Sequence, residues 1–86
     1  MKLVVLFDFT LNNDPKDRFY KHVMKVMATQ NGFSQISGKL KFVCGCGCSM
    51  TDAVFHVDKK LKDAVAAVAK LENIDLSLAT VHYTVE

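Results

Sequence analysis

The sequence predicts an α+β fold in which two helices cover one face of a four-stranded antiparallel sheet. Two observations lead to this prediction. Residues 2–10 form an apolar run rich in β-branched and aromatic residues, and two later segments show helical spacing between stretches of alternating polarity. With 86 residues, of which 50% are hydrophobic, the chain suits one small domain over residues 1–86 that completes its burial by forming an oligomer.

The first strand is predicted at residues 2–10, KLVVLFDFT. Both of its faces are apolar, which is typical of a central strand covered on two sides. Leu3, Val5, Phe7 and Phe9 share one face, and Val4 and Leu6 share the other. Asp8 follows on the second face. A carboxylate in such surroundings needs a charged partner, a metal ion or the edge of the sheet.

The first helix is predicted to begin after the turn-rich LNNDP and to run to about residue 30. Asp14 is a suitable N-cap and Pro15 suits the first helical position. Asn31 and Gly32 are expected to end the helix, because glycine readily takes the left-handed conformation found there.

Two further strands are predicted at residues 35–43 and 53–57. In the first, Ile36, Leu40 and Phe42 share one face, and Lys39, Lys41 and Val43 share the other. CGCGCSM, residues 44–50, follows as a hairpin or bulged connection, because it is too rich in glycine for a strand interior. In the second, Ala53, Phe55 and Val57 alternate with Val54 and His56.

Asp58 is expected to cap the second helix, and alternating residues 79–86 form the last strand. The order strand, helix, strand, strand, helix, strand with right-handed crossovers is the split βαβ, or ferredoxin-like, arrangement βαββαβ. The first and third strands are then central, and the cysteine turn lies at the same end of the sheet as Asp8. The uncovered sheet face is expected to carry Val4, Leu6, Val43, Val54, Asp8, Lys39, Lys41, His56 and His82. A mixed apolar and basic face suggests a homodimer surface or a ligand platform.

Composition excludes several classes of protein. No apolar run approaches the ~20 residues of a membrane span. The first residues lack the cleavage site of a secretory signal, so we expect a cytoplasmic protein. Three cysteines within five residues argue against a secreted disulfide framework.

Three features resemble the small CRISPR-associated adaptation protein, a family of ferredoxin-like dimers that act beside the spacer integrase. They are LVVLFDF, the helix DRFYKHVMKVMATQ, and NGF at the start of the next strand. The virulence-associated protein D ribonucleases are similar in the same way. The resemblance implies that Asp8 binds Mg²⁺ or Mn²⁺ together with its mate across the dimer axis, in members that cut nucleic acid. Without the resemblance, the residues alone favour a strand-end carboxylate that makes an Asx-turn or caps a helix.

The cysteines indicate a second chemistry. In an extended segment Cys44, Cys46 and Cys48 would point the same way, and three thiolates suit Zn²⁺ or Cu(I). Alternatively, they are small hydrophobic residues in a glycine-rich turn.

Lys39, Lys41, Arg18 and Lys21 are the candidates for contacts with DNA or RNA phosphates. The sequence and the resemblance therefore predict a dimeric nucleic-acid-binding protein of the adaptation type. An integrase or another protein is expected as a further partner. Metal-dependent endonuclease activity is expected to be centred on Asp8. The alternative is a non-enzymatic ferredoxin-like module that binds a soft metal through CGCGC or inhibits another protein by surface contact.

Overall fold

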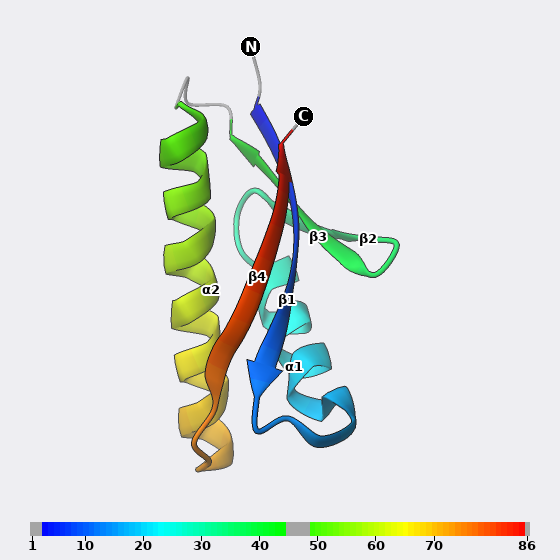
Figure 1. Cartoon of the computed structure of the whole chain (residues 1–86), viewed down its shortest axis with the longest axis vertical. Helices are drawn as coiled ribbons and strands as arrows, with labels where there is room; N and C mark the ends of the chain where they lie inside the picture. The colour runs from blue at the N-terminus through cyan, green and yellow to red at the C-terminus, as the bar shows by residue number, and fades with distance from the viewer. Residues whose placement is uncertain (1–2, 45–48, 86) are drawn as a thin grey trace.

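The computed structural model describes residues 3–44 and 49–85, and its fold is the predicted ferredoxin-like α+β sandwich (Figure 1). Among these residues four strands form one antiparallel sheet with two helices packed on one of its faces. The elements are β1 (Leu3–Asn12), a 3₁₀ turn (Pro15–Asp17), α1 (Arg18–Ala28), β2 (Phe33–Ile36), β3 (Lys39–Cys44), α2 (Met50–Glu72) and β4 (Ser77–Val85). None of the described helices has the length and apolar character needed to cross a membrane.

The strands lie in the order β2-β3-β1-β4, so the first and third strands are central as predicted, although the third strand is Lys39–Cys44 and not residues 53–57. β1 pairs with β3 from Leu3, opposite Cys44, to Phe7, opposite Leu40. It pairs with β4 along nearly its whole length, from Val5 to Asn12, with one irregularity after Thr10. The short β2 and the nine-residue β4 form the two edges.

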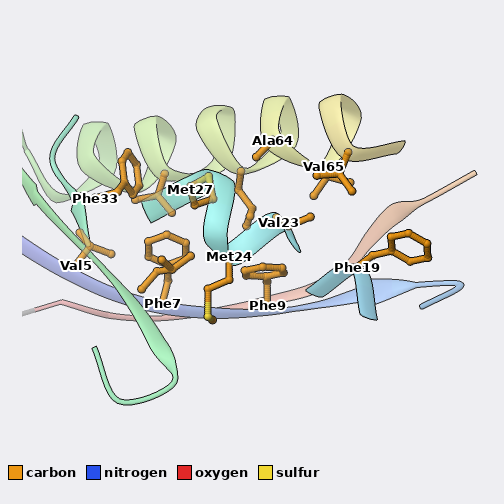
Figure 2. Packing of buried hydrophobic residues seen from close by; sticks show 14 of the residues in the cluster. Val5, Phe7, Phe9, Phe19, Val23, Met24, Met27, Phe33, Ala64 and Val65 are labelled. Atoms are coloured by element: carbon orange, nitrogen blue, oxygen red, sulfur yellow. The ribbon is translucent and has the colours of Figure 1, made fainter. Parts of the chain in front are cut away.

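The core lies between the sheet and the two helices (Figure 2). Alternate residues of β1, namely Val5, Phe7 and Phe9, are buried beneath the helices. Phe7 packs edge-on against Phe33, with 6.0 Å between ring centroids. Each fully buried apolar side chain of this size contributes roughly 1.5–3 kcal/mol. The remaining members of this core are Phe19, Val23, Met24, Met27, Leu40, Ala53, Val57, Leu61, Ala64, Val65, Val68 and Leu76.

α1 begins three residues later than predicted. Lys16 and Asp17 have φ angles of 61° and 55°, and these left-handed conformations keep residues 15–17 out of the helix. Asp14 nevertheless caps α1, because its two carboxylate oxygens accept hydrogen bonds from the backbone N–H groups of Phe19 and Tyr20, each at 2.8 Å. The sequence thus identified the side chain that caps α1, but the N-cap position itself is Asp17, and the turn of residues 15–17 was not predicted.

The single strand predicted at residues 35–43 is wrong, because a tight turn divides it. Ser37 and Gly38 both have positive φ, 44° and 78°, and they join β2 to β3 as a two-residue hairpin. Such a turn matches the right-handed twist of the two strands. Ile36 therefore lies directly opposite Lys39 and on the same sheet face as that lysine. The sequence had placed these two residues on opposite faces.

The strand predicted at residues 53–57 is also wrong, since these residues belong to α2. Ala53, Val57 and Leu61 are fully buried and recur every four residues, which makes one stripe on a continuous helix. Ser49 caps this helix by accepting a hydrogen bond from the N–H of Asp52 at 3.2 Å. Asp58, the predicted cap, lies inside α2 and accepts a hydrogen bond from the Tyr83 hydroxyl.

Because the second and third strands differ from the predicted ones, the cysteine segment begins at a different end of the sheet. β3 ends at Cys44, which pairs with Leu3 at the beginning of β1. The segment therefore leaves the sheet at the end opposite Asp8, and the prediction that the two share an end is wrong. Residues 45–48 lie outside the described residues.

Candidate nucleic-acid interface

The sheet face away from the helices is the surface on which most of the predicted functional residues meet. Directly paired residues of antiparallel strands point to the same side of a sheet, so the strand register identifies this surface, which we call the open face. It carries Val4, Leu6, Asp8, Thr10, Ser34, Ile36, Lys39, Lys41, Val43, Thr80, His82 and Thr84. In the described part of the chain no helix covers them.

The open face changes from apolar to basic along β3. Val4 and Val43 lie opposite each other toward the beginning of β1. Lys41 lies between Leu6 and Ser34, and Lys39 lies beside the β2–β3 turn. Neither lysine forms an ion pair with a described residue. We call the part around Val4 and Val43 the apolar end and the part around Lys39 and Lys41 the basic end. The two adjoin, because Leu6 lies opposite Lys41 and Ile36 lies opposite Lys39.

Asp8 lies where β1 loses its neighbour β3. Pairing with β3 stops at Phe7, which leaves the next part of β1 unpaired on that side. The Asp8 Oδ1 atom accepts a hydrogen bond from the N–H of Phe9 at 2.9 Å and another from the Tyr20 hydroxyl at 2.8 Å. The carboxylate thus replaces the missing strand as an acceptor, and it ties α1 to the sheet.

Tyr20 is a site residue that the sequence reasoning missed, since its helical spacing indicated only a core position. Its ring lies 4.8 Å from that of Phe9, and its hydroxyl also lies 3.2 Å from the carbonyl oxygen of Gly38. Burial, followed by the hydrogen bond to Asp8 and the negative charges of Asp8 and Asp17, raises the pKa of Tyr20 well above its ordinary value. The tyrosine therefore stays a neutral hydrogen-bond donor. Asp8, Phe9, Thr10, Asp17 and Tyr20 line a pocket of about 290 Å³ here.

The described residues of a single chain do not provide enough ligands to hold a Mg²⁺ or Mn²⁺ ion at Asp8. One of the two carboxylate oxygens already accepts two hydrogen bonds. His82 lies directly across from Asp8 on β4, but no group of three or more metal-ligating side chains occurs among residues 3–44 and 49–85. These hard cations require several oxygen ligands. Beyond what residues 3–44 and 49–85 provide, a metal at Asp8 consequently needs further ligands, which a second chain or a nucleic acid would supply.

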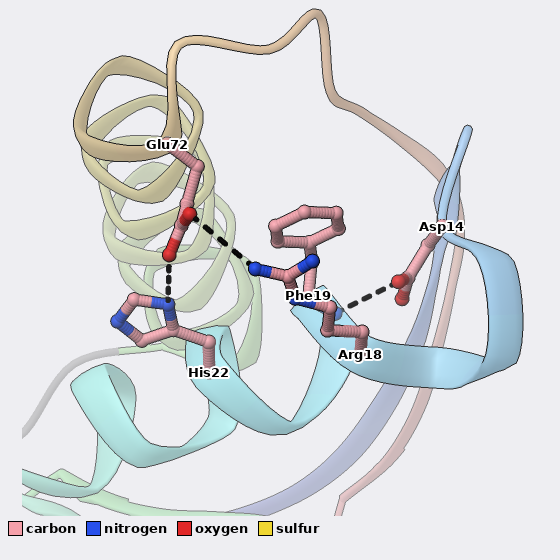
Figure 3. Close-up of polar contacts among 5 residues, drawn as sticks. All are labelled: Asp14, Arg18, Phe19, His22 and Glu72. Carbon is pink, nitrogen blue, oxygen red and sulfur yellow. Dashed lines mark hydrogen bonds and ion pairs between the residues drawn. The ribbon is translucent and has the colours of Figure 1, made fainter.

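The other two predicted contact residues lie in the helical layer. Arg18 and Lys21 belong to α1, so they do not share a surface with Lys39 and Lys41. Arg18 Nη2 lies 3.6 Å from Glu72 Oε2, and His22 Nδ1 lies 3.7 Å from Glu72 Oε1 (Figure 3). These pairs join the start of α1 to the end of α2. Arg18 is 70% exposed, so the contact is a weak one.

The remaining predicted metal ligands are the cysteines and histidines, and the structure describes only some of them. Cys44 is the last residue of β3, and Cys46 and Cys48 lie outside the described residues. Of the two histidines predicted on the uncovered face, His82 lies there, opposite Asp8. His56 and Val54 belong to α2, so the prediction that they lie on the sheet is wrong.

The chain matches no protein-family model, no curated protein and no solved structure. Its membership of the adaptation family accordingly stays a prediction from the three sequence features.

Proposed function

We propose that the chain is a homodimeric nucleic-acid-binding protein of the adaptation type, and that the open face is its working surface. The observation that carries the proposal is the placement of Lys39 and Lys41 together at the basic end of this face, without a carboxylate partner among the described residues. Two lysines that alternate along a strand are about 7 Å apart, so both can contact the phosphate backbone of one nucleic-acid strand.

The apolar end of the same face supports the dimer. Val4, Leu6 and Val43 are only partly buried by their own chain. A second copy that covers these side chains would complete their burial, and Lys41, which lies opposite Leu6, would border the contact. β4 offers a further route, because its outer edge has no strand partner among the described residues.

Binding should depend on salt and on Lys39 and Lys41. Contacts to phosphates release counterions, so affinity should fall steeply with rising salt and depend little on base sequence. Lys39→Glu combined with Lys41→Glu should weaken binding of duplex or single-stranded nucleic acid at least about tenfold at low salt. Fluorescence anisotropy of labelled DNA and RNA measures this effect.

Lys59→Glu combined with Lys60→Glu is the matched control, because it makes the same charge change at two exposed positions of α2. It should cost distinctly less affinity than the sheet variant. An equal loss in both variants would show a non-specific charge effect and would contradict an interface on the open face.

Metal-dependent cleavage is a narrower proposal. It rests on further ligands beside Asp8 from a second chain or from the phosphates of the nucleic acid. Asp8→Ala should therefore leave nucleic-acid binding intact and remove any Mg²⁺- or Mn²⁺-dependent cleavage. Cleavage that survives this substitution would exclude Asp8 as its centre.

A protein-binding module is the second candidate function. Met50 and Phe55, in the first turns of α2, are large apolar side chains that are 57% and 65% exposed. An integrase or a protein to be inhibited could cover them. Protein binding becomes the preferred function if the chain binds neither DNA nor RNA at low salt.

A further inference from the structure

A groove in the helical layer, separate from the open face, collects a second group of basic side chains. It lies between α1 and the edge strand β2, and its volume is about 420 Å³. Lys21, His22 and Lys25 line it from α1, and Gln35 lines it from β2. The three α1 residues occupy positions i, i+1 and i+4, which lie on adjoining parts of one helix surface.

The charges in this groove are available to a ligand. Lys21 and Lys25 are exposed, and neither forms an ion pair with a described residue. His22 is partly buried, and its Nδ1 atom faces Glu72 at 3.7 Å. Figure 3 shows the second ring nitrogen of His22 on the side of the ring away from Glu72. The carboxylate thus fixes the ring orientation and leaves Nε2 free of this contact.

We propose that this groove binds the phosphate group of a small phosphorylated molecule about the size of a nucleoside monophosphate. Lysine ammonium groups are common phosphate ligands, and the side-chain amide of Gln35 adds an uncharged donor. The volume falls within the range of small-molecule pockets. Glu72 stands beside His22, so a continuous polyanion that extended past the histidine would meet a carboxylate. That arrangement favours a single phosphate group over a nucleic-acid strand.

This binding site does not depend on the proposed nucleic-acid interface. The groove uses α1 and β2 residues in the helical layer, whereas Lys39 and Lys41 project from the opposite face of the sheet. Lys39→Glu with Lys41→Glu should therefore leave binding in the groove unchanged. Failure of one proposal can thus be distinguished from failure of the other.

Titration of the ¹⁵N-labelled chain at constant ionic strength tests the inference. Inorganic phosphate and adenosine 5′-monophosphate should each cause saturable amide shifts at Lys21, His22, Lys25 and Gln35, and adenosine should cause none. Lys21→Gln combined with Lys25→Gln should weaken binding of the monophosphate by roughly tenfold or more, because two charge-assisted contacts are lost.

The control is Lys59→Gln combined with Lys60→Gln, which removes two exposed lysines from α2 and should have no effect. Shifts spread evenly over all lysines, or an equal loss in both double variants, would overturn the proposal. Shifts in the groove with a single-stranded oligonucleotide but with neither small phosphate would also overturn it, because the groove would then belong to the nucleic-acid interface.

Discussion

The two faces of β1 differ in how completely one chain buries them. Val5, Phe7 and Phe9 point toward the helices and are at most 1% exposed. Val4, Leu6 and Asp8 alternate with them, point to the open face and remain partly accessible. One face of β1 is thus fully buried in the core, whereas the other face is only partly buried by its own chain. Stability should depend on the first set of residues, and association and binding on the second.

The largest expected difference is between neighbouring residues of this strand. Phe7→Ala removes a ring from the core and should lower the free energy of unfolding by about 3–5 kcal/mol, which approaches the total stability of a small domain. Leu6→Ala should cost less than about 1 kcal/mol in the monomer. Urea unfolding of both variants at low protein concentration measures the two effects.

At higher protein concentration Leu6→Ala should also lower the fraction of dimer seen by light scattering. If Leu6→Ala destabilises the monomer as much as Phe7→Ala does, the two faces are equally buried and the comparison fails.

A smaller effect is expected at Tyr20, which links the two faces by its bond to Asp8. Tyr20→Phe should cost about 1 kcal/mol near neutral pH, because it removes a hydrogen bond to a partly exposed carboxylate. The raised pKa of Tyr20 means that the folded state holds the phenol proton more tightly than the unfolded state does. The stabilisation is therefore complete below the ordinary tyrosine pKa of about 10 and is lost as pH rises above it.

Urea unfolding of wild type and Tyr20→Phe between pH 8 and pH 11 tests this link. The difference between the two proteins should be constant up to about pH 10 and should shrink above it. A difference that grows with pH would show that the hydroxyl is not held as a donor to Asp8.

The smallest effect is expected at the contact between the helices. Arg18→Gln removes an exposed ion pair with Glu72 and should change the free energy of unfolding by about 0.5 kcal/mol or less. Thermal unfolding at low and high salt should differ little between this variant and wild type. A loss above about 2 kcal/mol would mean that the Arg18–Glu72 pair contributes far more than an exposed contact normally does.

Sequence reasoning succeeded where local pattern determines structure. The alternation of Val5, Phe7 and Phe9 and the capping carboxylate of Asp14 are both properties of neighbouring residues. It failed at the Ser37–Gly38 turn. Because this turn contains two residues, Ile36, Leu40 and Phe42 all fall on even-numbered positions, so the alternation along the chain continues as it would in one unbroken strand. It failed again at residues 53–57, where five residues fit both a strand period and the helical stripe that continues to Leu61.

In the candidate site, too, some features follow from the local sequence pattern and others do not. The position of Lys39 and Lys41 on one strand face follows from alternation alone. The bond from Tyr20 to Asp8 depends on where β3 stops beside β1, and the groove depends on where α1 lies over β2. These are tertiary arrangements, and no spacing along the chain indicates them.

Amide shift mapping with nucleic acid is the most direct test of the open face as the working surface. When single-stranded or duplex DNA is added to the ¹⁵N-labelled chain at low salt, shifts should concentrate on Lys39, Lys41 and the adjoining open-face residues of β1. The amides of α2, including those of Lys59 and Lys60, should barely move. Shifts confined to the helical layer, or none at all with either DNA or RNA, would contradict the proposed function.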